Sequence, residues 1–135
     1  AGVIMTRPLD FESLERPRTP NTYLVAPEGL CRAAVPDEDS PVFAVPQDEM
    51  FRRVREAVAA APRWREVFAD ASTGALQFVA VSALFRFRDD VDVLVVPGPD
   101  GQGAQIAVYS RSRVGYSDLG ANRKRVRALM AELES

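Results

Sequence analysis

Residues 76–113 read LQFVAVSALFRFRDDVDVLVVPGPDGQGAQIAVYSRSR, and this stretch largely determines the predicted fold. Three runs in it are rich in Val, Leu, Ile and Phe and predict strands: 76–88, 91–96 and 104–113. Asp89 and Asp90 separate the first two runs, and a Pro-Gly-Pro-Asp-Gly turn at 97–101 separates the last two. Because turns and short connectors join the runs without a crossover helix, they predict an antiparallel sheet. The odd positions of the first run form an uninterrupted apolar face: Val79, Val81, Ala83, Phe85 and Phe87.

Two helices are predicted on either side of this stretch. Residues 47–60 carry apolar side chains at helical spacing, and Pro62 ends the run. Residues 119–133 repeat the pattern, with Ser117 or Asp118 placed to cap the helix. Short strands are predicted at 42–45 and 64–69. This order predicts an α+β fold: a two-layer sandwich in which a curved antiparallel sheet of about four to six strands carries both helices on one face.

Proline marks the N-terminal part of the chain, since six of the ten prolines lie at or before position 41. Proline lacks a backbone donor and keeps the residue before it extended. We therefore expect residues 1–40 to form an extended Pro-rich arm. This arm is expected to pack on a single α+β domain, residues 41–135, through apolar side chains such as Phe11 and Leu14.

The composition excludes several kinds of function. The chain has 135 residues, a net charge of −2 and no histidine, which excludes Ser-His-Asp and Cys-His catalysis and zinc sites that contain histidine. Its single cysteine, Cys31, cannot form an internal disulfide and lacks the partners of a metal site. The acidic balance gives no general attraction to nucleic acid. No nucleotide or nucleophile motif is present, so the sequence favours a non-catalytic protein without a cofactor.

Basic residues gather near the C-terminus, where six occur between Arg111 and Arg127 against a single acid. On an extended strand Arg111 and Arg113 lie on one face about 7 Å apart, and the start of the following helix adds further donors. These residues predict an anion-binding surface at the strand–helix junction, formed by Arg111, Arg113, Asn122 and Arg125. The alternative is that the strand arginines form cross-strand ion pairs and the helical ones form a solvated face.

Three aspartates, Asp89, Asp90 and Asp92, are the natural counterpart of these arginines. Carboxylates at this spacing could hold Mg²⁺ or Ca²⁺ with water completing the coordination shell. The sequence favours a structural role instead, in which the carboxylates pair across the sheet with arginines. The candidate partners are Arg86, Arg88, Arg111 and Arg113. We therefore predict no metal site.

Residues 110–125, with the helix that follows them, resemble the C-terminal signature of the domain of unknown function 1499 family. Phe-Arg-Asp-Asp-Val at 87–91 resembles its central strand, and Arg-Pro-x-Thr-Pro-Asn at 16–21 is similar to its N-terminal motif. Many relatives have cysteines where this chain has Arg16 and Thr22, so a metal or disulfide role for those cysteines does not apply here. The motif-matching positions are Asn21, Asp89, Asp90, Arg111, Arg113, Gly115, Asp118, Asn122 and Arg125.

The resemblance implies a small bacterial domain, with relatives in plastids, that often follows a membrane anchor or lies in the cell envelope. We therefore expect this chain in the bacterial cell envelope, membrane-anchored or periplasmic, with the cytoplasm as the alternative. Membrane attachment would come only through a segment absent from this chain.

Three functions are consistent with the sequence. The favoured one is a non-catalytic binding or scaffolding domain that holds an anion, an acidic segment of a protein partner or an anionic lipid head group. The second is an envelope protein that handles a lipid or another apolar ligand, with a pocket lined by Val79, Val81, Phe85, Phe87 and Trp64. The third is a metal-dependent enzyme that uses Asp89, Asp90 and Asp92.

Overall fold

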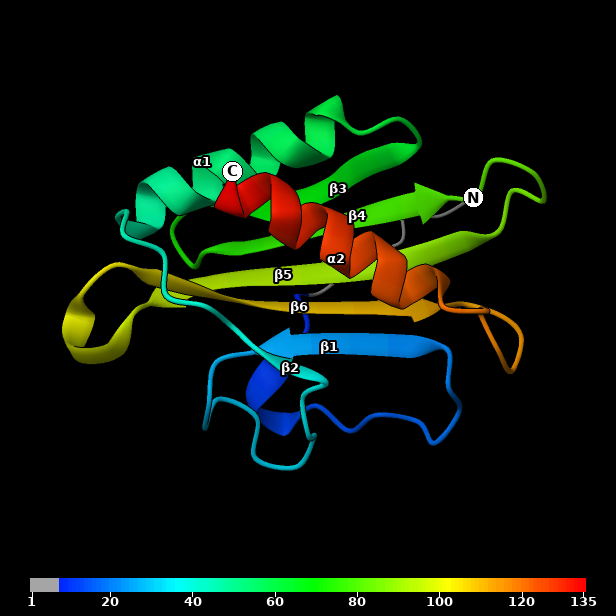
Figure 1. Ribbon diagram of the computed structural model, residues 1–135, viewed down its shortest axis with the longest axis horizontal. Helices are drawn as coiled ribbons and strands as arrows, with labels where there is room; N and C mark the ends of the chain where they lie inside the picture. Colours follow the sequence, from blue (N-terminus) through cyan, green and yellow to red (C-terminus); the bar gives the residue numbers. More distant parts are fainter. Residues whose placement is uncertain (1–7) are drawn as a thin grey trace.

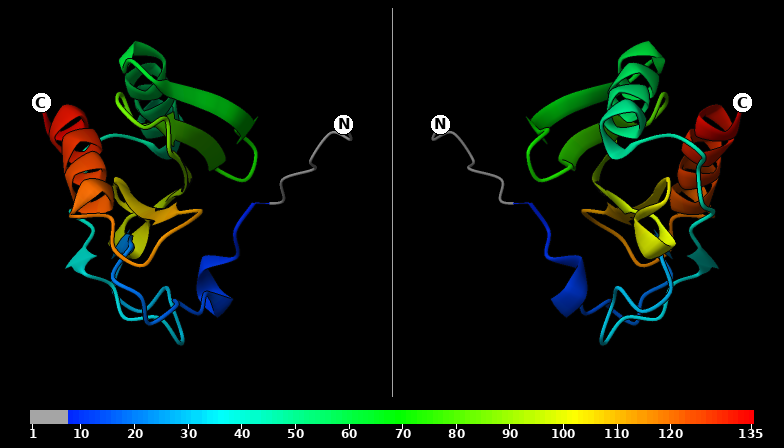
Figure 2. Two further views of the ribbon diagram at one scale, coloured as in Figure 1. Left: turned by 90° about the vertical axis from the view of Figure 1, so that its right-hand side faces the viewer. Right: turned by 90° about the vertical axis from the view of Figure 1, so that its left-hand side faces the viewer.

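The structure, a computed structural model, describes residues 8–135 and places them in one six-stranded sheet with two α-helices (Figure 1). Its elements are, in chain order, η1 (Phe11–Ser13), β1 (Thr22–Ala26), β2 (Glu38–Asp39), α1 (Gln47–Ala60), β3 (Trp64–Asp70), β4 (Ala75–Val81), β5 (Arg88–Pro97), η2 (Pro99–Gly101), β6 (Ala104–Ser112) and α2 (Ala121–Glu134). The strands lie in the order β2-β1-β6-β5-β4-β3, and every neighbouring pair is antiparallel except β1 and β2. The predicted α+β fold with both helices on one face is confirmed (Figure 2).

The main core fills the space between the sheet and the helices. Side chains alternate between the two faces of a strand, and in β4 the even positions Leu76, Phe78 and Ala80 are the ones buried against the helices. The predicted uninterrupted odd face is therefore wrong. The strand ends at Val81, residues 82–87 form a loop, and Phe85 and Phe87 are exposed to solvent.

The N-terminal segment is more regular than the predicted Pro-rich arm, which is not confirmed as such. Strand β1 lies inside it and pairs with β6, because Thr22-Tyr23-Leu24-Val25-Ala26 is free of proline and rich in strand-forming residues. Conversely, the strand predicted at 42–45 is reduced to an isolated bridge between Phe43 and Ala104. Residues 1–7 of the predicted arm lie outside the described residues.

The N-terminal segment also forms a second, smaller core on the face of the sheet opposite the helices. Phe11 and Leu14 pack there with Leu24, Ala107 and Tyr109 of β1 and β6. The predicted packing of Phe11 and Leu14 is therefore confirmed. The N-terminal segment covers this face over β1 and β6, whereas side chains of β3, β4 and β5 line a groove on the remainder.

Replacing Phe11 with alanine tests whether the N-terminal segment is part of the packed domain. Phe11 is 2% exposed, so Phe11→Ala should lower the free energy of unfolding by about 3–5 kcal/mol, as measured by urea denaturation. Val35→Ala is the control, because Val35 is 78% exposed and its loss should change stability by less than about 0.5 kcal/mol. Equally small effects of both substitutions would contradict this packing.

Candidate functional site

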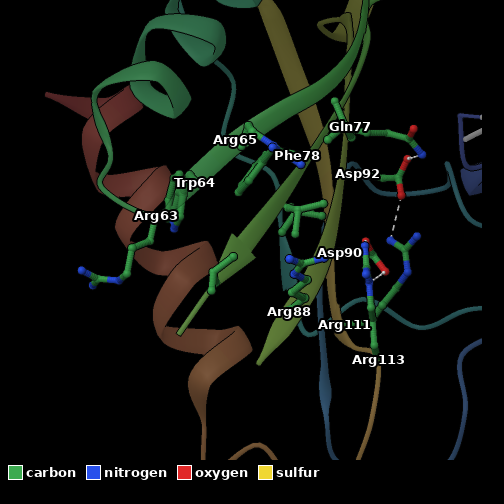
Figure 3. A pocket seen from close by; sticks show the side chains of 14 residues that line it. Arg63, Trp64, Arg65, Gln77, Phe78, Arg88, Asp90, Asp92, Arg111 and Arg113 are labelled. Atoms are coloured by element: carbon green, nitrogen blue, oxygen red, sulfur yellow. Dashed lines mark hydrogen bonds and ion pairs between the residues drawn. The ribbon is translucent and has the colours of Figure 1, made fainter. Parts of the chain in front are cut away.

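A groove of about 840 Å³ lies on the open face of the sheet, opposite the helices (Figure 3). Its apolar lining includes Val67 of β3 with Val79 and Val81 of β4. Five arginines and two aspartates supply its charged groups: Arg63, Arg65, Arg88, Arg111, Arg113, Asp90 and Asp92. We call this feature the open-face groove. Although the whole chain has a net charge of −2, the charged groups of the groove have a net charge of +3.

Strand register explains why these residues share one face. Arg65 pairs with Val79, Val79 with Asp90, and Asp90 with Arg111, so four neighbouring strands each contribute one position to the same row. Residues directly opposite each other in paired strands point to the same side of a sheet. The groove is therefore a consequence of sheet register rather than of a single loop.

Two of the five arginines are already paired within the groove. Arg113 donates through Nε and Nη2 to the carboxylate of Asp90, at 3.0 and 2.8 Å, and these hydrogen bonds raise the pKa of Arg113. Arg111 Nη1 lies 2.8 Å from Asp92 Oδ2, and its guanidinium lies 5.1 Å from the centre of the Tyr109 ring. The alternative of cross-strand ion pairs is thus confirmed for both strand arginines.

The other three arginines, Arg63, Arg65 and Arg88, are exposed and form no ion pair with any residue between 8 and 135. Arg65 lies on one side of the groove and Arg111 and Arg113 on the other, whereas the side chain of Arg63, at the rim, extends outward (Figure 3). We did not single out Arg63 or Arg65 from the sequence. The alternation of side chains along β3 indicates that Arg65 and Val67 lie on the same face of the strand. Only the register with β4 shows which face of the sheet that is.

The predicted four-residue anion surface is not assembled as a single site. Arg111 and Arg113 face the open groove, whereas Asn122 and Arg125 lie on the helix side of the sheet. Arg125 Nη2 pairs with Asp89 Oδ2 at 2.9 Å, and both side chains are largely buried. The reason is strand alternation: Asp89 and Asp90 are consecutive in β5 and point to opposite faces.

Asn122 is the centre of a buried polar network on the helix side. Its side chain is fully buried; its Oδ1 accepts from Ser110 Oγ at 2.6 Å and from Arg125 Nη1 at 2.9 Å. Its Nδ2 donates to the Asn21 carbonyl oxygen at 2.9 Å, to Ser112 Oγ and to Asp118 Oδ2. The network therefore joins α2 to β6 and to the N-terminal segment.

Most motif-matching positions belong to this network. Asn21 Nδ2 donates to the carbonyl oxygen of Gly115 at 2.8 Å, which fixes the loop between β6 and α2. Gly115 has a φ of +89°, a conformation that glycine adopts without strain. Helix α2 begins at Ala121, two residues later than predicted, and its N-cap residue is Gly120. Asp118 still accepts from the backbone amides of Gly120 and Asn122 and so caps the first turn from two residues upstream of the N-cap. Asn21, Asp89, Gly115, Asp118, Asn122 and Arg125 thus have structural partners in the described residues.

The carboxylate of Asp118 is held in its ionised form. Burial alone would raise its pKa, but hydrogen bonds from the side chain and backbone of Asn122 and from the backbone of Gly120 outweigh burial and lower the pKa below 3.8. An ionised cap is also favoured by the positive end of the helix dipole.

The geometry does not assemble the metal site considered for Asp89, Asp90 and Asp92. Asp89 faces the helices and the other two face the groove, and an arginine pairs with each carboxylate. Within residues 8–135 there is no group of three or more His, Cys, Asp or Glu that could hold a metal ion. Burial raises the pKa of the Cys31 thiol, which reduces the fraction of nucleophilic thiolate at neutral pH.

Asp118→Asn tests the helix cap through its pH dependence. Because the folded pKa is depressed, the ionised carboxylate stabilises the fold above the pKa of the unfolded chain, and this stabilisation is lost as the pH falls through the folded pKa. The variant should unfold more easily than the wild type at about pH 7, and the difference should shrink below about pH 4.

The control for this measurement is Asp100→Asn. Asp100 is exposed, and its carboxylate accepts no hydrogen bond from the described residues. Urea denaturation over the same pH range should show a much smaller pH-dependent difference for this variant. A stability loss in Asp118→Asn that stays constant down to about pH 2 would contradict the role of the ionised carboxylate.

Comparisons with known proteins reach the level of the family. A crystal structure of a protein from Chromobacterium violaceum aligns with a TM-score of 0.41 at 11% identity, over 85% of this chain and 94% of the other. One from Thermus thermophilus aligns with a TM-score of 0.36 at 12% identity, over 70% and 91%. No curated protein matches the chain.

In the part of the chain that the structure describes, no helix has both the length and the apolar character that a membrane span needs. The family described as "Protein of unknown function (DUF1499)" matches residues 14–133, most of the chain. The resemblance drawn from the sequence motifs is thereby confirmed, and the chain belongs to the DUF1499 family.

Proposed function

We propose that this chain is a non-catalytic binding domain that recognises an anionic group, most simply an acidic segment of a protein partner, through the open-face groove. The supporting observation is the group of three arginines, Arg63, Arg65 and Arg88, that line the groove without an ion-pair partner among the described residues. The site differs from the strand–helix junction expected from the sequence, because Asn122 and Arg125 lie on the opposite side of the sheet.

The chemistry of the groove suits carboxylates. A guanidinium presents several donors in one plane and binds a carboxylate through two parallel hydrogen bonds. Arg65 and Arg88 flank Val79 and Val81, with which they pair across the strands. A ligand that alternates acidic and apolar side chains would therefore match the groove in an extended conformation.

The two ion pairs within the groove, Arg113–Asp90 and Arg111–Asp92, affect where a ligand carboxylate can bind. Arg113 is 44% exposed and Asp90 35% exposed in their side chains, so a ligand carboxylate can compete with Asp90 for the same guanidinium. Asp92 is nearly buried, and its pairing with Arg111 keeps that arginine engaged. The negative charges of Asp90 and Asp92 oppose that competition, so the unpaired Arg63, Arg65 and Arg88 are the main contacts of the proposed ligand.

The alternative of an apolar-ligand protein loses part of its expected pocket. Val79, Val81 and Trp64 line the groove, but Phe85 and Phe87 lie outside it on an exposed loop. On the helix side, the space is filled by a continuous core from both helices and the sheet. The proposal therefore rests on the charged groups. A location in the bacterial cell envelope, implied by the resemblance, remains part of the proposal.

The double variant Arg65→Gln with Arg88→Gln tests this function. The probe is a short fluorescein-labelled peptide rich in glutamate, followed by fluorescence anisotropy at low ionic strength, with inorganic phosphate titrated in parallel. Loss of two charge-assisted contacts should weaken peptide binding by at least about tenfold. Added salt should weaken wild-type binding as well.

A matched control carries the same change in charge outside the groove. Arg18→Gln with Arg32→Gln removes two exposed arginines that do not line it, and binding should stay within about twofold of the wild type. If both double variants weakened peptide binding equally, the effect would be due to net charge alone, and this would contradict the proposal. Failure of the wild-type protein to bind either probe at low salt would also contradict it.

A further inference from the structure

Six large apolar side chains are exposed on two loops at the same end of the sheet. They are Leu84, Phe85 and Phe87 in the loop between β4 and β5, and Val114, Tyr116 and Leu119 in the loop between β6 and α2. Both loops leave the same end of the sheet, because Val81 pairs with Arg88, and Asp89 pairs with Ser112 at the end of β6. Both loops project beyond the ends of the strands (Figure 1). We call these six side chains the apolar tip.

Local interactions hold these side chains outward. Ser82 and Phe87 close the first loop through two hydrogen bonds, and the rings of Phe85 and Phe87 stack at 5.7 Å. In the second loop Leu119 has a φ of +54°, which is unfavourable for a branched side chain, and is 96% exposed. Strained backbone and exposed apolar surface both cost free energy in the isolated chain, which points to a partner at this end.

The charges around the apolar tip are basic. Residues 82–88 contain two arginines and no acid, and residues 114–124 have a net charge of +1, Arg113 being left out because it is paired with Asp90. The only acid in the second segment, Asp118, caps α2 and accepts three hydrogen bonds from Gly120 and Asn122. A chain whose overall charge is −2 thus presents a positive end around an apolar projection.

We propose that the apolar tip inserts into the surface of an anionic lipid bilayer, so that this chain contacts a membrane through its own residues and not, as the sequence led us to expect, only through a segment absent from it. Projecting loops that combine aromatic and aliphatic side chains with arginines suit the interface between lipid head groups and acyl chains, where the rings are buried and the guanidinium groups remain at the phosphates. A bilayer accepts a convex projection, whereas a tightly bound protein partner is usually anchored by side chains held in pockets. None of the six side chains lines the open-face groove, although Arg88, one of the basic residues beside the tip, also lines that groove.

Phe85→Trp gives a direct readout of insertion. The chain has one tryptophan, Trp64, which stacks on Phe78 at the edge of the core. The probes are vesicles of phosphatidylcholine alone and of phosphatidylcholine mixed with phosphatidylglycerol. Relative to the wild-type protein, Phe85→Trp should show a blue-shifted emission and protection from an aqueous quencher with the anionic vesicles, and neither change with phosphatidylcholine alone.

A second experiment measures vesicle binding by flotation. Phe85→Ser with Leu119→Ser removes one anchor from each loop and should reduce partitioning onto anionic vesicles by at least about tenfold. Val35→Ser with Val42→Ser is the matched control, because both valines are exposed apolar residues outside the apolar tip. The control should bind vesicles as the wild type does, and circular dichroism should show both variants folded.

Three results would overturn this inference. The wild-type protein could fail to bind anionic vesicles at low salt, or the tip variant could partition onto them as the wild type does. The third result is that the apolar tip mediates self-association instead. The last is checked by sedimentation without lipid, where concentration-dependent dimerisation lost in the tip variant would assign the tip to a second copy of the chain. None of these results bears on peptide binding in the open-face groove, so the two proposals fail independently.

Discussion

The buried contact between Asp89, Arg125 and Asn122 is the interaction on which the rest of the structure depends. It ties α2 to β5 and β6, and through the backbone of Asn21 it ties the N-terminal segment to the same point. Breaking a buried ion pair by removing one partner is costly because the other charge remains desolvated. The positions that match the family motif are therefore explained, for the most part, as parts of one structural network.

The residues of this network stabilise the fold, whereas other residues carry the proposed function. Strand alternation sends Asp89 to the helix side and Asp90 to the open face, so adjacent aspartates pair with arginines in different environments. The pair on the helix side is almost buried, whereas the pair in the groove is partly exposed and can exchange partners. Since the motif arginine Arg125 is engaged in the fold, the groups available to a ligand come from Arg63, Arg65 and Arg88.

The sequence predicted where the helices and strands lie more accurately than which of their side chains face the core. Helix α1 was predicted at 47–60 and is found there, because its apolar spacing and Pro62 are local signals. The cap at Asp118 was likewise local. In contrast, Val79 and Val81 were grouped with Phe85 and Phe87, although the former line the groove and the latter lie on a loop. The grouping was wrong because β4 ends at Val81. The sequence has no clear strand terminator at that position, so the end of the strand could not be predicted. The separation of Arg113 from Arg125 depends on sheet register and on where α2 packs, which are long-range properties.

A double-mutant cycle between Asp89 and Arg125 tests the central claim most directly. Asp89→Asn, Arg125→Met and the double variant would be compared with the wild type by urea denaturation, and the cycle isolates the energy of their interaction. The structure predicts a coupling of about 2 kcal/mol or more for this buried pair, against less than about 1 kcal/mol for the matched cycle of Asp90→Asn and Arg113→Met in the exposed groove. Additive effects at Asp89 and Arg125, within about 0.5 kcal/mol, would contradict the account.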